Sequence, residues 1–349
     1  MQASPELQTK LDEQRRKVDV DHFDVTVREL VRMAAEGELE RAPAYQRKFR
    51  WTDGDESRLI ESLFLGLPVP SLFVAANANG TWEVVDGLQR LSSLIHFVAD
   101  PVVLLSTVSK TEPLRLCELK KVPDLNGLTY GDLPGPLRLA FNKRALRVTA
   151  LSDKSDLHAR FDLFERLNTG GIALTPQEVR ACIFRGPFND LLRDLAEEET
   201  FRRLVKLQKV RQEDGTREEI VLKFFAYLHA RDQFKGAVTE FLNNYMEQAS
   251  NSFDSESGKQ LFRNVVQHLH TGLSGPFVRA GYSNTPVTQL EAVMVALGDL
   301  IRDGQTPTPP KPGWLNDPEL VRASTGGTNT ASMLRDRIKR ARELWTEVA

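Results

Sequence analysis

The hydrophobic pattern of this chain changes once, near Gly186-Pro187, and this change limits the folds that the chain can adopt. Up to about residue 185, short runs typical of strands alternate with stretches that have the spacing of helices. Beyond this point strand patterns almost vanish, and long amphipathic stretches follow at 217–231, 254–271, 288–303 and 331–347. This order predicts an α+β domain followed by an all-helical one, with α/β as the alternative for the first part.

The length of the chain fits this division. Its 349 residues suit two domains, since one domain has ~100–200 residues. The first twenty residues are polar and charged, and they are expected to form a frayed arm. We therefore predict an arm at 1–20, an α+β domain at 21–185 and a helical domain at 186–349.

Charge, cysteine content and hydropathy exclude several classes of protein. The 46 Lys and Arg against 48 Asp and Glu give a net charge of −2, which excludes a globally basic protein, so a nucleic-acid or phosphate site must be a local patch. Cys117 and Cys182 are too few for a disulfide framework or for a zinc site of their own. There is no signal-peptide pattern and no apolar run of membrane-spanning length. We expect a cytoplasmic protein without membrane contact.

The segment 86–90 (DGLQR) is predicted to lie where a strand is followed by a helix. Strand-like runs at 71–75 and 81–85 flank turn residues and predict a hairpin, after which helical spacing begins. The free N–H groups of a helix N-terminus suit a phosphate, and Gly87 would let it approach the backbone. Arg90 could then bind phosphate oxygens, Asp86 a bridging cation, and Gln89 a water. The same residues are also typical of a turn and a solvated helix face that bind nothing.

A basic and aromatic segment at 45–51 (YQRKFRW) precedes a helix that Thr52 is expected to cap and Gly66 to end. Its cations could neutralise phosphates, and its rings could stack on a base. Its alternating aromatic residues are also typical of a half-buried strand with the basic residues outside. The segment alone does not distinguish these two interpretations.

A polar loop with two adjacent glycines, 168–171 (NTGG), separates two predicted helices. The first has its apolar residues on one stripe over 155–167, and the second begins at a capping box on Thr175 and runs over 176–184. Such a loop can wrap an anion with its backbone N–H groups. It is equally typical of an ordinary helix end.

Signs of other chemistry are weak. The motifs of Walker nucleotidases, dinucleotide enzymes and α/β-hydrolases are absent from the sequence. Among the histidines only His268 and His270 are close, and at i, i+2 of a helix they point to different sides, so no zinc site is expected. Asp100 with Glu118 and Lys120 faintly resembles the carboxylate and strand-borne Glu-x-Lys of metal-dependent nucleases.

Three local clusters of basic residues could contact a phosphate backbone. They are Arg138, Lys143, Arg144 and Arg147, then Arg202, Arg203, Lys206, Lys209 and Arg211, and finally Arg335, Arg337, Lys339, Arg340 and Arg342. Such runs are also typical of solvated helix faces. DNA is therefore one expected partner, and the salt dependence of binding would distinguish the two interpretations.

Four separated motifs occur in an order that is far more specific than any of them alone. They are YQR at 45–47 with Trp51, LIESL at 59–63 followed by GLPVP at 66–70, VVDGLQRL at 84–91, and FERLNTGG at 164–171. Together they resemble the N-terminal domain of GmrSD-type restriction enzymes over roughly residues 20–185. The resemblance implies a ParB/sulfiredoxin-like fold and a bacterial or phage-related protein of the defence-system class.

In that family an Asp-Gly-Gln-Gln-Arg motif is associated with binding and hydrolysis of a nucleoside triphosphate, which drives or gates DNA cleavage. The resemblance implies catalytic roles for Asp86, Gln89 and Arg90, with Mg²⁺ on Asp86. The residues that it implies for nucleotide binding are Tyr45, Gln46, Arg47, Gly87, Asn168, Thr169, Gly170 and Gly171. Leu88 replaces the first Gln of the motif, so binding without turnover is an expectation beside hydrolysis.

The favoured function is a module of a DNA-targeting defence system that binds a nucleoside triphosphate, with or without hydrolysing it. Full members of the family carry a His-Asn-His-like nuclease domain, and no His-rich motif follows residue 270, so cleavage is expected of a separate nuclease partner. The alternatives are a non-catalytic ParB-like DNA-binding scaffold and, less favoured, a metal-dependent DNA nuclease. The helices at 217–231 and 331–347 could bury their stripes within the chain or in a homo-oligomer.

Overall fold

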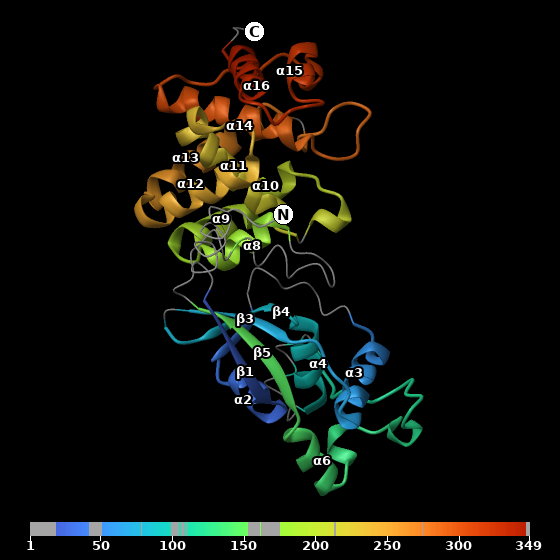
Figure 1. Cartoon of the computed structure of the whole chain (residues 1–349). Coiled ribbons are helices and arrows are strands. Elements are labelled where there is room, and N and C mark those ends of the chain that lie inside the picture. Colours follow the sequence, from blue (N-terminus) through green and yellow to red (C-terminus); the bar gives the residue numbers. More distant parts are fainter. Residues whose placement is uncertain are drawn as a thin grey trace, which may run out of the picture. The chain divides into compact units, whose positions relative to one another are not determined.

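The computed structural model describes residues 19–41, 51–77, 79–98, 105, 108, 110–152, 161, 175–212, 214–273 and 275–346. The chain divides into two compact units, Met1–Ala173 and Leu174–Ala349. Figure 1 shows that the described part of the first unit contains a sheet with helices and that the described part of the second consists of helices and loops.

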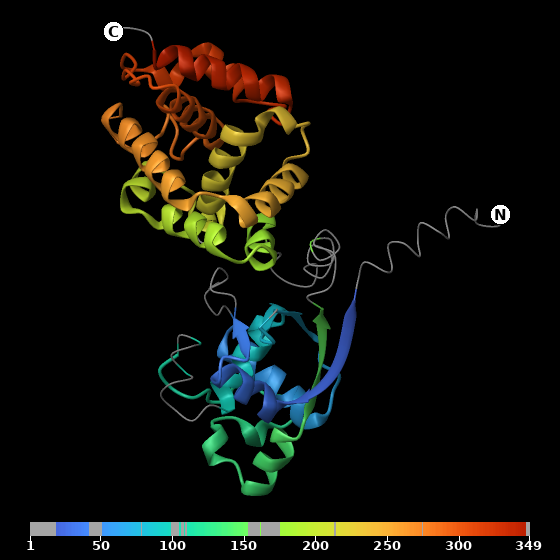
Figure 2. The ribbon, with the colours of Figure 1, turned by 90° about the vertical axis from the view of Figure 1, so that its left-hand side faces the viewer.

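The first unit is built on a five-stranded mixed sheet. Its strands are β1 (Val20–Thr26), β2 (Leu39–Arg41), β3 (Leu72–Ala76), β4 (Trp82–Asp86) and β5 (Ala145–Leu151). Their order is β1-β5-β3-β4-β2. The pair β3–β4 is the predicted antiparallel hairpin, and β1 lies beside β5 and antiparallel to it (Figure 2). Because β3 runs parallel to β5 and β2 parallel to β4, the sheet is mixed.

Helices pack on this sheet through their apolar sides. They are α2 (Val27–Ala35), α3 (Asp53–Leu65), α4 (Leu88–Val98) and α6 (Gly135–Asn142), with 3₁₀ turns η2 (Pro123–Leu125) and η3 (Tyr130–Asp132). Helix α4 contacts both α2 and α3. Ile60, Leu72, Leu94 and Phe97 are fully buried in the shared core. Burying such side chains contributes about 1.5–3 kcal/mol each, so this core anchors α3 and α4 on the sheet.

The ends of two helices follow from residues next to them. The Thr52 hydroxyl accepts a hydrogen bond from the backbone of Asp55, whose carboxylate accepts one from the backbone of Thr52. Gly66 ends α3 with a left-handed φ of 70°. Thr175 and Glu178 form the same reciprocal pair at the start of the predicted second helix. The predicted cap at Thr52 and the predicted capping box at Thr175 are therefore confirmed, and the structure adds a capping box at Thr52.

The second unit is a group of packed helices. They are α8 (Pro176–Ile183), α9 (Pro187–Glu197), α10 (Glu199–Leu204), α11 (Thr216–Ala230), α12 (Val238–Ser252), α13 (Ser255–Thr271), α14 (Val287–Arg302), α15 (Pro318–Ala323) and α16 (Ala331–Leu344), with 3₁₀ turns η5 (Lys209–Arg211), η6 (Arg231–Gln233) and η7 (Trp314–Asn316). Most of α14 is buried, because it packs against α11, α13 and α16.

The predicted fold class, an α+β part followed by an all-helical part, is confirmed. The division between the units falls before α8, whereas the sequence pattern placed the domain boundary after it. The physical reason is that α8 packs against α11 and α12 of the second unit. In the part of the chain that the structure describes, no helix is both long and apolar enough to cross a membrane.

Candidate functional site

The DGLQR motif occupies the junction that the sequence predicted. Strand β4 ends at Asp86, and α4 begins at Leu88. Across the first turn of α4, Nη2 of Arg90 donates a hydrogen bond to Oδ2 of Asp86 at 2.8 Å and another to the carbonyl oxygen of Ser71 at 3.0 Å. The Asp86 side chain is 41% exposed, whereas that of Arg90 is 15% exposed. The pair therefore presents a carboxylate to solvent and holds the guanidinium in place behind it.

Gly87 has a packing role that the motif alone does not reveal. Its φ is +97°, and a Cβ at this position would lie 2.4 Å from Cδ2 of Leu72 and 3.0 Å from Nη2 of Arg90. The sequence suggested that this glycine gives a ligand access to the backbone. The structure shows that Leu72 and Arg90 occupy the space where its side chain would be, so glycine is required for the junction itself.

Gln89 and Leu88 both contact other parts of the unit. Oε1 of Gln89 accepts a hydrogen bond from the backbone N–H of Trp51 at 3.2 Å. This contact joins the motif to the last residue of the 45–51 segment. Leu88 is partly buried against the core, so it extends the apolar side of α4, as the helical spacing predicted.

Several predicted site residues lie outside the described residues. They are Tyr45, Gln46, Arg47, Asn168, Thr169, Gly170 and Gly171, together with Asp100 of the nuclease-like pattern. The structure therefore brings together Asp86, Gly87, Gln89 and Arg90, and their nucleotide-binding neighbours stay predictions.

The nuclease-like pattern is not on a strand. Residues 117–121 form no strand; Glu118 has a left-handed φ of 59°, and its carboxylate lies against Gly54 in the first turn of α3. Side chains of α3 hold this segment, because Ser57 accepts a hydrogen bond from the backbone of Cys117 and Glu61 accepts two, from Lys121 and Val122. The expected strand-borne Glu-x-Lys is wrong, since these backbone groups bond to a helix rather than to a neighbouring strand.

Many residues of the basic clusters are engaged within the chain. The contacts are Arg144 with the carbonyl of Phe64, Arg147 with Asp24, Arg202 with Glu197, Arg203 with Glu199, Arg337 with the carbonyl of Thr328, Lys339 with Glu343, Arg340 with Asp317 and Arg342 with Asp303. Lys206, Lys209 and Arg211 are exposed and make no ion pair with another described residue. They are the strongest remaining candidates for phosphate contacts in the second cluster.

The fold and the junction define an α+β domain that presents a polar Asp-Gly-x-Gln-Arg motif at a strand-to-helix turn. Residues 27–185 match the family model described as GmrSD restriction endonuclease, N-terminal domain. Residues 27–185 therefore form a domain of the GmrSD N-terminal family, as the order of the motifs indicated. No curated protein and no solved structure shows a significant match to the chain.

Proposed function

We propose that this chain binds a nucleoside triphosphate with Mg²⁺ at the DGLQR motif and acts as the nucleotide-responsive part of a restriction-type defence system. The observation that carries the proposal is the Asp86–Arg90 pair at the first turn of α4. Backbone N–H groups at a helix N-terminus favour phosphate oxygens, and a guanidinium one turn later can add charge-assisted hydrogen bonds. The family match adds the restriction-type context.

An unsatisfied donor supports an anion at this place. The buried Nε of Arg90 has no hydrogen-bond partner among the described residues, although Nη2 of the same group is fully engaged. A buried donor without a partner costs about 1–3 kcal/mol, which a phosphate oxygen would recover. Asp86 suits Mg²⁺, because this ion typically binds through one or two carboxylates together with substrate phosphates. Bound there, the ion would neutralise phosphate charge beside Arg90.

Asp86→Ala and Arg90→Ala should each weaken nucleotide binding by at least about tenfold, since each removes a charge-assisted contact. The measurement is a titration of the full chain with each ribonucleoside triphosphate and Mg²⁺, with phosphate release followed in parallel. Phosphate release that Asp86→Ala abolishes would show that the protein hydrolyses the nucleotide. Binding without phosphate release would indicate a nucleotide-responsive switch that does not hydrolyse its ligand.

The matched control is another Asp–Arg pair of the same unit, Asp24 and Arg147. Their side chains also approach to 2.8 Å, but they lie exposed on β1 and β5, strands that carry no residue of the motif. Asp24→Ala and Arg147→Ala should bind nucleotide as the wild type does. If Asp86→Ala and Arg90→Ala bind equally well, the proposal is wrong.

A second candidate function, a DNA-binding scaffold, is favoured by the exposed cations of the second unit. In this case binding to duplex DNA would weaken steeply with salt and would not respond to nucleotide. Lys209→Ala should then reduce the slope of log affinity against log salt by about 1. The control is Lys339→Ala, which should leave the slope unchanged, because the ammonium of Lys339 already faces the carboxylate of Glu343. A flat salt response of the wild type would exclude this function.

A further inference from the structure

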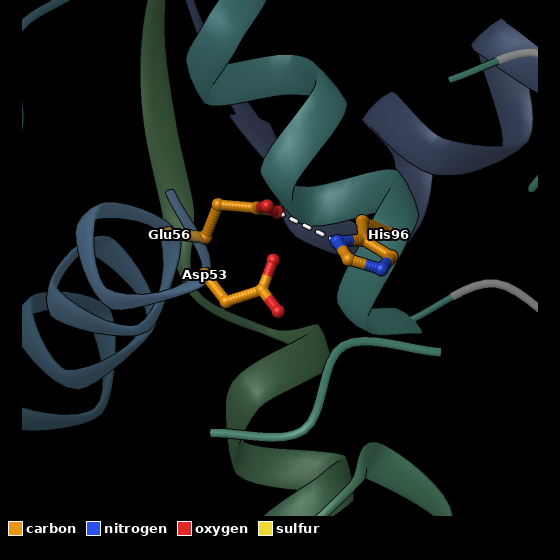
Figure 3. Close-up of side chains that lie close together, drawn as sticks. All are labelled: Asp53, Glu56 and His96. Carbon is orange, nitrogen blue, oxygen red and sulfur yellow. Dashed lines mark hydrogen bonds and ion pairs between the residues drawn. The ribbon is translucent and has the colours of Figure 1, made fainter. Parts of the chain in front are cut away.

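Helices α3 and α4 bring together three side chains of the types that bind metal ions. Asp53 and Glu56 project from α3 toward His96 of α4 (Figure 3). One potential metal-binding atom of each side chain lies within 4.8 Å of the corresponding atoms of the other two. Glu56 and His96 are 0% and 4% exposed, whereas the Asp53 side chain is 59% exposed. The cluster is thus buried on one side and open to solvent on the other.

The hydrogen bonds of His96 require a positive charge between it and Glu56. Nε2 of His96 lies 3.0 Å from the carbonyl oxygen of Glu112, which can only accept, so Nε2 carries a hydrogen. Nδ1 lies 2.8 Å from Oε2 of Glu56. A neutral ring then directs a lone pair at a carboxylate, and a proton or a metal ion must lie between the two atoms. Metal-binding histidines typically donate their second N–H to a carbonyl in this way.

The second oxygen of Glu56 is the independent indication of a missing ligand. Oε1 is buried and has no hydrogen-bond partner among the described residues. The ammonium of Lys110 lies 3.5 Å from this oxygen and 3.1 Å from Oδ1 of Asp53. Lys110 thus places a positive charge near both carboxylates but leaves Oε1 of Glu56 without a hydrogen bond. A buried oxygen without a hydrogen bond costs free energy in a protein interior.

We propose that Asp53, Glu56 and His96 bind a divalent transition-metal ion, with Zn²⁺ as the best-suited species. Two ligand atoms of one tetrahedral zinc ion lie about 3.4 Å apart, since each is ~2.0–2.2 Å from the metal. Nδ1 and Oε2 are 2.8 Å apart, so they need to separate by only about 0.6 Å to admit the ion. One imidazole with two carboxylates suits Zn²⁺ better than Mg²⁺ or Ca²⁺. Lys110 competes for the same carboxylates, and its long side chain can turn to solvent when the ion binds.

The ion would join α3 to α4, the helix that carries Gln89 and Arg90 of the candidate nucleotide site. His96 follows Gln89 by seven positions along α4, or about 10 Å at helical rise. Trp51, two residues before α3, bonds to Gln89, and Glu56 of α3 bonds to His96, so the two contacts follow both segments in the same direction. The metal site is nevertheless separate from the motif residues, and its existence does not depend on nucleotide binding.

The test is a calorimetric titration of the chelator-treated full chain with ZnCl₂, with bound metal measured after dialysis. We expect one Zn²⁺ per chain and at least about tenfold weaker binding in Asp53→Asn and Glu56→Gln. Lys110→Met should bind Zn²⁺ several-fold more tightly, because the competing ammonium is gone. Asp53→Asn and Lys110→Met alter side chains that reach solvent, so they keep the test valid if Glu56→Gln does not fold.

Two controls separate this site from other carboxylates and from the motif. Asp24→Asn removes an exposed carboxylate of the same unit and should leave the zinc affinity unchanged. Asp86→Ala should also leave it unchanged, even though nucleotide binding falls. If the wild type binds no stoichiometric Zn²⁺, a proton joins Glu56 and His96 and the proposal fails. It also fails if Asp53→Asn and Lys110→Met both bind Zn²⁺ as the wild type does.

Discussion

Replacing Gly87 with alanine should lower the free energy of unfolding of the N-terminal unit by about 2–5 kcal/mol. The first cause is the backbone, because φ is +97°, a conformation that is strained for any residue with a Cβ. The second is packing, because the new Cβ would lie 2.4 Å from Cδ2 of Leu72, which is fully buried and cannot retreat. The Cβ would also approach the guanidinium of Arg90, so nucleotide binding should fall together with stability.

Gly80→Ala is the matched control for this variant. Gly80 also has a positive φ, +84°, but within the described part of the chain no heavy atom lies within 4 Å of the place that an alanine Cβ would take. It should therefore lose only the backbone contribution, about 1–3 kcal/mol. Chemical denaturation of the full chain, followed by hydrogen exchange of β3 and α4, measures the difference. Equal losses in the two variants would show that the contact between Gly87 and Leu72 has no energetic weight.

Arg180→Ala should destabilise the helical unit by about 3 kcal/mol. Arg180 is fully buried and donates to Glu219 at 2.6 Å, to Gln177 at 2.8 Å and to Asn243 at 3.4 Å. Removing it leaves polar groups of α8, α11 and α12 without their donor. We expect a loss of stability at the lower end of the range for broken buried ion pairs, because Glu219 still pairs with Lys223, whose Nζ lies 2.9 Å from Oε1 of Glu219.

The same variant should show a changed response to acid. Burial raises the pKa of Glu219, but Lys223 and Arg180 outweigh it and hold the pKa below its usual value. The stabilisation from this carboxylate is therefore present above the usual pKa of about 4.3 and is lost as the pH falls through the lower folded value. The stability difference between wild type and Arg180→Ala should shrink in the same range.

Arg203→Ala provides the control for Arg180. Arg203 pairs with Glu199 on the surface, with both side chains largely exposed. Its removal should change the free energy of unfolding by less than about 0.5 kcal/mol. Denaturant titrations of the three proteins at neutral and acid pH supply the comparison. A loss in Arg180→Ala as small as that in Arg203→Ala would contradict the structural role of the buried pair.

Local features of this protein could be predicted because a few adjacent residues determine them. Thr52 and Thr175 mark helix starts by bonding to groups three residues away, and Asp86-Gly87 ends a strand through turn chemistry. The helical spacing also correctly placed Leu88 against the core. The junction of the candidate site was therefore predictable.

Contacts across long stretches of chain were not predictable in the same way. Glu56 and His96 are forty residues apart, and the expectation of no zinc site rested on histidines that are close in sequence. One available signal was the carboxylate of Glu56, which precedes Ile60 by one turn on the apolar side of its helix. Such a residue needs a partner, but many residues of opposite or complementary type could supply one.

Residue patterns alone therefore predicted the β3–β4 hairpin, the capped starts of α3 and α8, the DGLQR junction and the family of the N-terminal domain. The tertiary structure decided that Gly87 faces Leu72, that Gln89 binds Trp51, that α8 packs with the second unit and that Glu56 meets His96. The physical reason is the separation in sequence between the residues that make each contact. Caps and turns are hydrogen bonds within about four residues, whereas these pairings exist only once the sheet and the packed helices have set which distant segments lie side by side.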